Sequence, residues 1–533
     1  MKKLLREDVD IIFPSCISAV GRGRWNSIAS CFTIIDDFEA FRSNLFQKGG
    51  SDMPGFLPDL ALLEWKINRV STTNPALSGR SDRIRLNPAL QLLRLSWKNL
   101  TYLLQLSRVD ASAQPDKGEE LVLIWTNPES GELSCRPALN EDLIALKIVA
   151  DDIEPRKVAP GQRESIVLID AVINQAVRNG LLLAPASGIR RQKSFLPKSS
   201  EVSRDFLSSD SFTLQWHITQ TCDLHCKHCY DRSDRKAVTL DQGMRILDDL
   251  HDFCRDRYVM GAVSFTGGNP LMHPDFMKLY GAAATRGFSL SILGNPCSQD
   301  RLEEIISIQK PYLFQVSLEG LSGHNDRIRG RGHFGRILEF LKILRRLEVY
   351  SMVMLTLTKD NMDQVVPLAG LLRECADKFH FNRLSMVGEG SNLRLPERRE
   401  YAAFLESCVE AAEGNPIMGL KDNLINIIRY RSGEDLFGGC AGFGCGAAFN
   451  FLAVLPDGEV HACRKFPSPI GDIFDKSLSE IYDSDTAARY RSGCSACSGC
   501  PIRPVCGGCL ASAYSHGRNI FEEKDPFCFM DIY

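Results

Sequence analysis

The sequence has no excess of charge of one sign. Its 63 Lys and Arg residues nearly balance its 66 Asp and Glu residues, and the formal net charge is -3. A protein whose main partner is a nucleic acid carries a basic excess, so we expect no nucleic-acid partner. No apolar run approaches the roughly 18 residues that span a bilayer, so we expect no membrane partner. The N-terminal segment lacks the apolar core of a secretory signal, because Arg6, Glu7, Asp8 and Asp10 interrupt it, which predicts a cytoplasmic protein.

Cysteine, by contrast, is abundant, and its distribution does not suit a disulfide framework. Of the 19 cysteines, nine lie between Cys440 and Cys528 and three lie between Cys222 and Cys229. The cytosol keeps thiols reduced, and thiolates are soft ligands for zinc and for iron-sulfur clusters. Clusters of cysteine in such a chain therefore indicate metal binding.

The apolar pattern changes twice along the chain. Residues up to about 108 show helical spacing, and two short strands near residues 119–138 followed by two helices suit a small winged-helix-like unit. Residues 186–211 are rich in Ser, Pro and basic residues, which is typical of a linker. Strands then alternate with helices, which predicts an α/β fold with a parallel sheet, a partial (β/α)6 TIM-like barrel. The predicted strands are 212–219, 261–266, 288–293, 313–318, 351–357 and 378–386.

Cys222, Cys226 and Cys229 follow directly after the first of these strands, in the pattern CxxxCxxC. Functional residues in parallel sheets gather at the carboxyl ends of strands. A structural zinc site uses four protein ligands, so three clustered thiolates leave one position open or filled from elsewhere. A four-iron four-sulfur cluster held by three thiolates has one iron free to bind a substrate.

This motif resembles that of the radical S-adenosylmethionine (radical SAM) superfamily, in which the free iron binds S-adenosyl-L-methionine. The segments "SFTGGNP", "GNP", "SLEG", "NDRIRGRGHF" and "LTLTKDN" follow in order near the ends of the next strands and resemble further motifs of the superfamily. Asn269 stands where the GGEP motif has a glutamate, which implies a weaker contact with the cofactor's ammonium. His228 is expected only to pack. The resemblance implies that the cofactor contacts are Gly267, Gly268, Asn269, Pro270, Asn295, Ser317, Glu319 and Arg329.

The C-terminal cysteines resemble the SPASM extension of radical SAM enzymes, which binds two auxiliary four-iron four-sulfur clusters. The resemblance implies one set of ligands, Cys440, Cys445, Cys463 and Cys509, and a second set, Cys497, Cys500, Cys506 and Cys528. The short "CGGC" gap leaves open an exchange between Cys506 and Cys509. Cys494 is left over: it could substitute for a neighbouring ligand, and it is a weak candidate for a catalytic or hydrogen-donating thiol. Paired zinc-ribbon sites remain an alternative, because CxxC pairs also suit zinc.

The apolar pattern and composition predict a helical N-terminal domain (1–110), a winged-helix-like unit that could recognise a peptide (118–185) and a linker (186–211). The resemblance covers residues 212–533 and implies a radical SAM barrel (212–390), a helical bridge (391–437) and a SPASM domain (438–533). With its N-terminal extension, the motif "CDLHCKHCYDRSDR" resembles the selenobiotic, or thio(seleno)oxazole-modification, radical SAM maturases.

Such an enzyme would modify a ribosomally made precursor peptide containing cysteine or selenocysteine, forming a thioether or another oxidised crosslink. The implied partners are a precursor peptide with a leader, and an external electron donor such as flavodoxin or ferredoxin. Peptide epimerisation and sulfatase-maturation-type protein oxidation are alternative reactions. The latter needs a carboxylate base after Cys463, where this chain has Arg464 and Lys465, and a cation cannot be that base at neutral pH. A zinc-cysteine binding module is the non-enzyme alternative.

Overall fold

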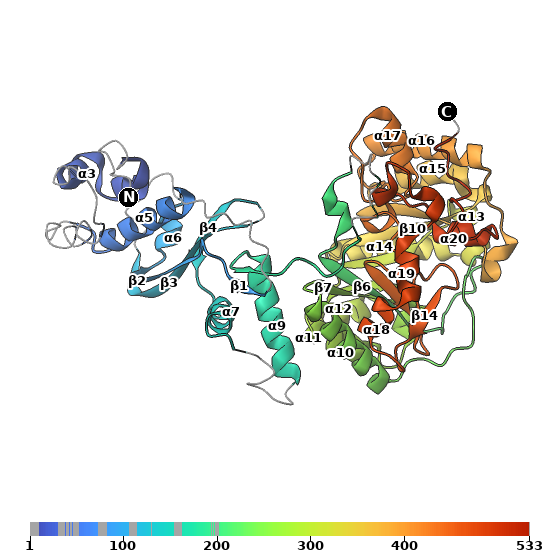
Figure 1. Cartoon of the computed structure of the whole chain (residues 1–533), viewed down its shortest axis with the longest axis horizontal. Helices are drawn as coiled ribbons and strands as arrows, with labels where there is room; N and C mark the ends of the chain where they lie inside the picture. Colours follow the sequence, from blue (N-terminus) through green and yellow to red (C-terminus); the bar gives the residue numbers. More distant parts are fainter. Residues whose placement is uncertain are drawn as a thin grey trace. The chain divides into compact units, whose positions relative to one another are not determined.

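The computed structural model describes residues 10–29, 38, 42, 45, 53–72, 83–105, 115–128, 130–153, 163–192, 195, 197 and 202–531. The chain divides into two compact units, Met1–Ala186 and Ser187–Tyr533 (Figure 1). Among the described residues, no helix is both long enough and apolar enough to cross a membrane. We describe each unit by itself.

The first unit is built on a three-stranded antiparallel sheet in the order β2-β3-β4. Its central strand explains the arrangement, because Val122 and Ile124 pack into one apolar cluster while Leu123 and Trp125 pack into another. The sheet is thus covered on both faces, as a continuous apolar strand requires. The elements of this unit are α2 (Pro14–Val20), α3 (Arg22–Ala29), α5 (Leu57–Thr72), β1 (Arg85–Leu86), β2 (Gln91–Lys98), α6 (Leu100–Leu103), β3 (Asp116–Thr126), β4 (Leu133–Pro137), α7 (Asn140–Ala150), α9 (Arg163–Arg178) and β5 (Leu182–Leu183).

Part of this unit differs from the sequence-based prediction. Residues 91–98, expected within a helical region, form β2 and pair with β3. The buried residues of β2, Leu93 and Leu95, alternate with exposed ones, but "QLLRLSWK" also carries leucines at neighbouring positions, which obscures a period of two. Pairing with β3, whose partner residues lie 18 to 33 positions further along the chain, decides the conformation of β2. The two later strands and helices α7 and α9 form where the sequence predicts them.

The second unit contains all six predicted parallel strands. They are β6 (Ser211–Thr219), β7 (Met260–Gly267), β8 (Ser289–Leu293), β9 (Leu313–Ser317), β10 (Ser351–Leu357) and β11 (Lys378–Arg383), and each pairs in parallel with the next. Connecting helices include α10 (Leu240–Asp256), α11 (Phe276–Thr285), α12 (Gln299–Ile308), α13 (Ser322–Arg329), α14 (His333–Arg346) and α15 (Val365–Leu372). These helices and the strands share one apolar core. The α/β prediction is therefore confirmed.

Strands from the cysteine-rich region continue this sheet. β12 (Phe451–Val454) pairs in parallel with β6, and β13 (Glu459–His461) and β14 (Pro469–Asp472) follow antiparallel. The full order is β11-β10-β9-β8-β7-β6-β12-β13-β14. The β12–β13 hairpin turns at "PDG", where Gly458 has φ 99°, and a Cβ there would lie 2.4 Å from the ring of Phe474. Because β12 pairs with β6, the edge of the parallel sheet at β6 is covered.

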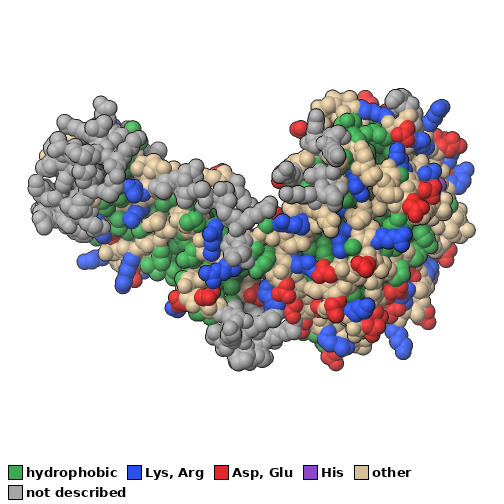
Figure 2. Space-filling model, viewed as in Figure 1, with side chains coloured by type: hydrophobic (Ala, Val, Ile, Leu, Met, Phe, Trp, Pro, Cys, Tyr) green, Lys and Arg blue, Asp and Glu red, His purple; other side chains and the backbone are tan. Residues whose placement is uncertain are grey.

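The remaining helices of the unit are α16 (Arg398–Gly414), α17 (Ile425–Ser432), α18 (Leu478–Asp483), α19 (Asp485–Ser492) and α20 (Leu510–Ser515). The described part of 186–211, expected as a linker, makes specific contacts within this unit. Arg191 donates to the carbonyl oxygens of Arg491, Phe443 and Cys445 at 2.6–3.1 Å. On the face shown in Figure 2, Lys and Arg are interspersed with Asp and Glu, as the balanced composition implies.

Candidate active site

The three-cysteine loop begins where β6 ends. Its first residues run beside the end of β7, because Gly268 N–H donates to Thr219 O and Asn269 N–H donates to Thr221 O, both at 2.8 Å. A Cβ on Gly268 would lie 2.3 Å from Thr221 O, and Gly267 has φ 126°. Only glycine fits at these positions without displacing the loop. The two glycines thus set the path of the chain into the cysteine loop.

The cysteines of this loop line a cavity of about 650 Å³ at the carboxyl ends of the barrel strands. Cys222, Cys226 and Cys229 form one side of the cavity. Burial raises the pKa of the Cys222 and Cys226 thiols, and the guanidinium of Arg329 beside Cys226 opposes this effect. A bound metal would outweigh the burial, because coordination deprotonates a thiol. Three thiols that share an open cavity fit a cluster that lacks a fourth protein ligand.

The predicted cofactor contacts fall into two groups. Gly267, Gly268, Asn295, Ser317 and Arg329 line the cavity. The other three, Asn269, Pro270 and Glu319, are buried and do not line it.

The Asn269 and Asn295 side chains meet at a residue that the sequence analysis did not single out. Both amide groups donate to Asp223 Oδ1, at 3.0 Å from Asn269 Nδ2 and 2.6 Å from Asn295 Nδ2. Asn295 Nδ2 also lies 3.6 Å from Cys222 Sγ. Asp223 belongs to the cysteine loop itself, directly after Cys222.

Glu319 and Arg329 form a buried ion pair. Arg329 Nε and Nη2 donate to Glu319 Oε1 at 2.8 and 2.6 Å, and Arg329 Nη1 lies 3.6 Å from Cys226 Sγ. Thr356 N–H donates to the other carboxylate oxygen at 2.7 Å. Burial lowers the pKa of His228, which lies beside this pair, to about 4, so its imidazole is neutral at pH 7. Glu319 therefore orients Arg329 at the cysteine loop.

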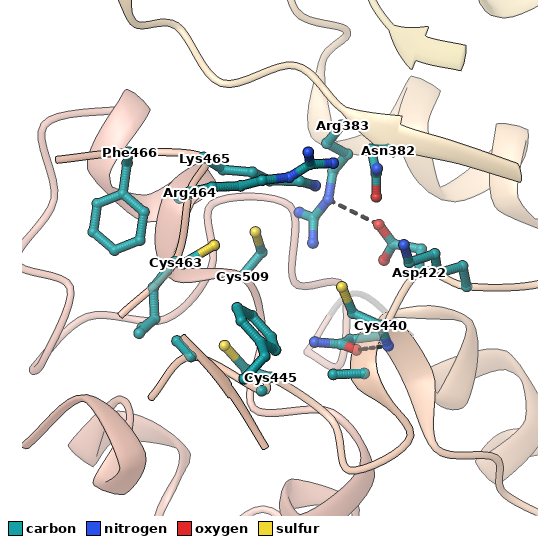
Figure 3. A pocket seen from close by; sticks show the side chains of 18 of the residues that line it. Asn382, Arg383, Asp422, Cys440, Cys445, Cys463, Arg464, Lys465, Phe466 and Cys509 are labelled. Carbon is teal, nitrogen blue, oxygen red and sulfur yellow. Dashed lines mark hydrogen bonds and ion pairs between the residues drawn. The ribbon is translucent and has the colours of Figure 1, made fainter. Parts of the chain in front are cut away.

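A second cavity, of about 270 Å³, is lined by Cys440, Cys445, Cys463 and Cys509 (Figure 3). Four cations, Arg383, Lys421, Arg464 and Lys465, also line it. Burial lowers the pKa of Lys421, and the nearby Cys440 opposes that effect. Lys421 has no motif and could not be found from the sequence. Cations around thiolates offset the negative charge that a ligand set of four cysteines carries.

A third cavity, of about 260 Å³, is lined by Cys497, Cys500, Cys506 and Cys528. The "CGGC" turn separates the second and third cavities. Gly507 and Gly508 have φ values of 62° and 68°, and this left-handed pair directs Cys506 to the third cavity and Cys509 to the second. The buried Cys494 lies instead on a small cavity with Cys445 and Cys497.

No group of three or more His, Cys, Asp or Glu side chains within the described ranges is arranged to hold a single metal ion. The cysteines of each set are distributed around a cavity instead. In a four-iron four-sulfur cluster each thiolate binds a different iron, so its four ligands surround a volume rather than one point.

Comparison with known proteins identifies two domain families in this chain. Residues 216–372 match the model of the radical SAM superfamily, and residues 445–509 match SPASM, an iron-sulfur cluster-binding domain. The chain has a radical SAM domain and a SPASM domain. It is a radical SAM enzyme, and its cofactors are S-adenosyl-L-methionine and four-iron four-sulfur clusters.

Two similar relatives of this radical SAM enzyme have names that describe different products, a bacteriocin and heme. The antilisterial bacteriocin subtilosin biosynthesis protein AlbA of Bacillus subtilis is 26% identical over 58% of this chain and 72% of its own. The AdoMet-dependent heme synthase of Methanosarcina barkeri is 23% identical over 59% of this chain and 95% of its own. Among solved structures, that of Streptococcus suis SuiB bound to precursor peptide SuiA has a TM-score of 0.50 at 18% identity. It covers 76% of this chain and 96% of that one, and shows the fold alone.

Proposed function

We propose that this radical SAM enzyme matures a ribosomally made precursor peptide that contains cysteine or selenocysteine, by forming a thioether or another oxidised crosslink. We further propose the thio(seleno)oxazole-modification maturases as its subfamily, on the loop "CDLHCKHCYDRSDR". The names of AlbA and of the SuiB complex with its precursor peptide support a peptide substrate. A flavodoxin or ferredoxin in the cytoplasm would be the electron donor.

The proposed ligands follow from the three cavities. Cys222, Cys226 and Cys229 would hold the cluster that binds S-adenosyl-L-methionine. The set Cys440, Cys445, Cys463 and Cys509 and the set Cys497, Cys500, Cys506 and Cys528 would each hold an auxiliary cluster. The support is that each set lines a cavity of its own. When bound, these groups supply a 5'-deoxyadenosyl radical that abstracts hydrogen and sites that transfer electrons.

The observation that carries the proposal is the shared wall of the first two cavities. Asn382, Arg383, Arg464 and Lys465 line both of them. A peptide in the larger cavity would therefore lie beside the cationic rim of the first auxiliary set, where Arg464 and Lys465 favour an anionic thiolate. Arg464 Nη1 lies 3.4 Å from Thr266 Oγ1, at the end of β7. A cation here does not accept a proton, so sulfatase-type oxidation, which needs a base at this position, is disfavoured.

The first unit would hold the leader of the precursor. β4 is an edge strand, since it pairs only with β3 among the described strands. Ala138 N–H donates to Leu121 O and Asn127 N–H donates to Glu132 O, so alternate residues of β4 face β3 and the N–H groups of Leu133 and Cys135 face outward. An extended leader can add a strand at such an edge.

Mass spectrometry tests the proposal. The enzyme is co-expressed with short cysteine-containing reading frames that neighbour its gene, and the peptides are compared with those made beside a Cys226→Ala variant. A crosslink predicts the loss of two hydrogen masses, an epimer predicts no mass change, and both should be absent with the variant. If the wild-type enzyme consumes S-adenosyl-L-methionine but modifies no peptide, and instead converts a tetrapyrrole, the peptide proposal is wrong.

A further inference from the structure

The carboxylate that the "SFTGGNP" segment lacks is present nearby, on another part of the chain. The resemblance implies that the glutamate of GGEP pairs with the ammonium group of S-adenosyl-L-methionine, and Asn269 replaces it here. Asn269 directs its amide nitrogen to Asp223 Oδ1 at 3.0 Å, while its own Oδ1 accepts from Leu271 N–H at 3.3 Å. Its oxygen therefore already accepts one hydrogen bond at the start of the short turn after β7, and Asn269 does not line the cavity.

Asp223 is held in a fixed position but is not neutralised. Asn269 and Asn295, which come from the ends of β7 and β8, both donate to its Oδ1. None of the described Lys or Arg side chains forms an ion pair with Asp223, and Oδ2 accepts no hydrogen bond from a described residue. A carboxylate offers about four acceptor sites, so most of its capacity is open. Asp223 is exposed and does not itself line the cavity, but its partner Asn295 lines the cavity and lies 3.6 Å from Cys222 Sγ.

We propose that Asp223 is the carboxylate that binds the ammonium group of S-adenosyl-L-methionine, with Asn269 and Asn295 as the residues that position it. In the GGEP motif the carboxylate stands on the segment after β7. In this chain that segment carries the amide of Asn269, and the carboxylate, Asp223, is on the cysteine loop. A carboxylate pairs its negative charge with the ammonium, which an amide oxygen cannot do, so Asp223 would supply the attraction that Asn269 alone lacks. The inference rests on cofactor binding beside the three-cysteine loop and is independent of the peptide substrate.

The test measures cofactor affinity in the anaerobic, cluster-loaded enzyme by equilibrium dialysis. Asp223→Asn keeps the shape of the side chain and removes its charge, and we expect the Kd for S-adenosyl-L-methionine to rise roughly 10- to 150-fold. An analogue lacking the α-amino group should bind both proteins equally. Asp234→Asn, which removes an exposed carboxylate from the same loop, is the matched control and should leave the affinity unchanged. Adding Asn269→Glu to Asp223→Asn should restore most of the affinity.

An unchanged Kd in the Asp223→Asn variant would overturn the inference, as would equal losses for the cofactor and its amino-free analogue, because the latter indicate a purely structural role. If Asp223→Asn fails to load iron, the same comparison is made with Asp223→Ser, which also removes the charge but keeps a small hydrogen-bonding side chain beside Asn269 and Asn295. A preference for the cofactor over the analogue that equals the wild-type preference would then overturn it. Failure of the wild-type enzyme to bind the cofactor would instead refute the assignment of the three-cysteine site.

Discussion

Replacing the buried Arg383 should destabilise the second unit more than replacing an exposed arginine such as Arg373. Arg383 ends β11, and its guanidinium pairs with Asp422 at 2.9 Å and with Asp525 at 2.8 Å. The three side chains are only 5%, 7% and 1% exposed, respectively. The ring faces of Tyr401 and Phe527 lie 5.5 and 5.6 Å from the guanidinium carbon.

The expected magnitude follows from what the substitution leaves behind. Arg383→Leu keeps most of the apolar volume but leaves two buried carboxylates without their cation. Removing one partner of a buried pair costs about 3–5 kcal/mol, which corresponds to a change of roughly 150- to 5,000-fold in the unfolding equilibrium. Asp525→Asn should cost less, about 1.5–3 kcal/mol, because Arg383 keeps Asp422 and the single amide oxygen still accepts one of the two N–H groups, of Cys509 and Phe527, that bond the two carboxylate oxygens.

Anaerobic urea unfolding followed by circular dichroism measures both variants, with Arg373→Leu, an exposed arginine, as the control. The double variant Arg383→Leu with Asp525→Asn should be less destabilised than the sum of the two single changes, because it leaves one buried carboxylate rather than two. If Arg383→Leu unfolds within about 0.5 kcal/mol of the Arg373→Leu control, the buried network does not stabilise the unit as argued.

Three further predictions concern other parts of the molecule. Cys506→Ala should cost the enzyme about one cluster's share of bound iron, whereas Cys494→Ala, outside the four-cysteine sets, should keep it, as iron and sulfide analysis will show. Burial holds the pKa of His333 at about 4, so the native state loses stability as the pH falls below about 6.5, by up to about 1.4 kcal/mol per pH unit. Thermal unfolding at pH 7 and 5.5 should show a smaller loss for His333→Gln, and an equal loss would contradict this origin. Cys135→Pro should weaken leader binding in a peptide-affinity assay while leaving cofactor cleavage intact, and Cys135→Val should affect neither.

Local sequence pattern was sufficient for the barrel but not for the contacts that complete its site. The six parallel strands are predictable, because each is a short apolar run between helical segments, as in "SMVMLTL". β2 was missed, since its conformation depends on pairing with β3 rather than on its own composition. The role of Asp223 was also invisible, because its partners Asn269 and Asn295 are 46 and 72 residues away along the chain.

The division of the C-terminal cysteines illustrates the same limit. Spacing alone left the exchange of Cys506 and Cys509 open, because the gap in "CGGC" has two residues where the SPASM pattern usually has three. The left-handed conformation of Gly507 and Gly508 turns the chain between them and sends the two thiols to different cavities. Glycine adopts this conformation readily, but the sequence does not state where it does so.

The pairing of β12 with β6 has a mechanical consequence. β6 ends at the three-cysteine loop. Along its side, main-chain hydrogen bonds join β6 to β12, the first strand of the hairpin that precedes Cys463. Separating the two cysteine regions would mean breaking that ladder, so they cannot swing apart as hinged lobes during turnover. The register of these strands therefore fixes the spacing between the three-cysteine loop and the hairpin that precedes Cys463.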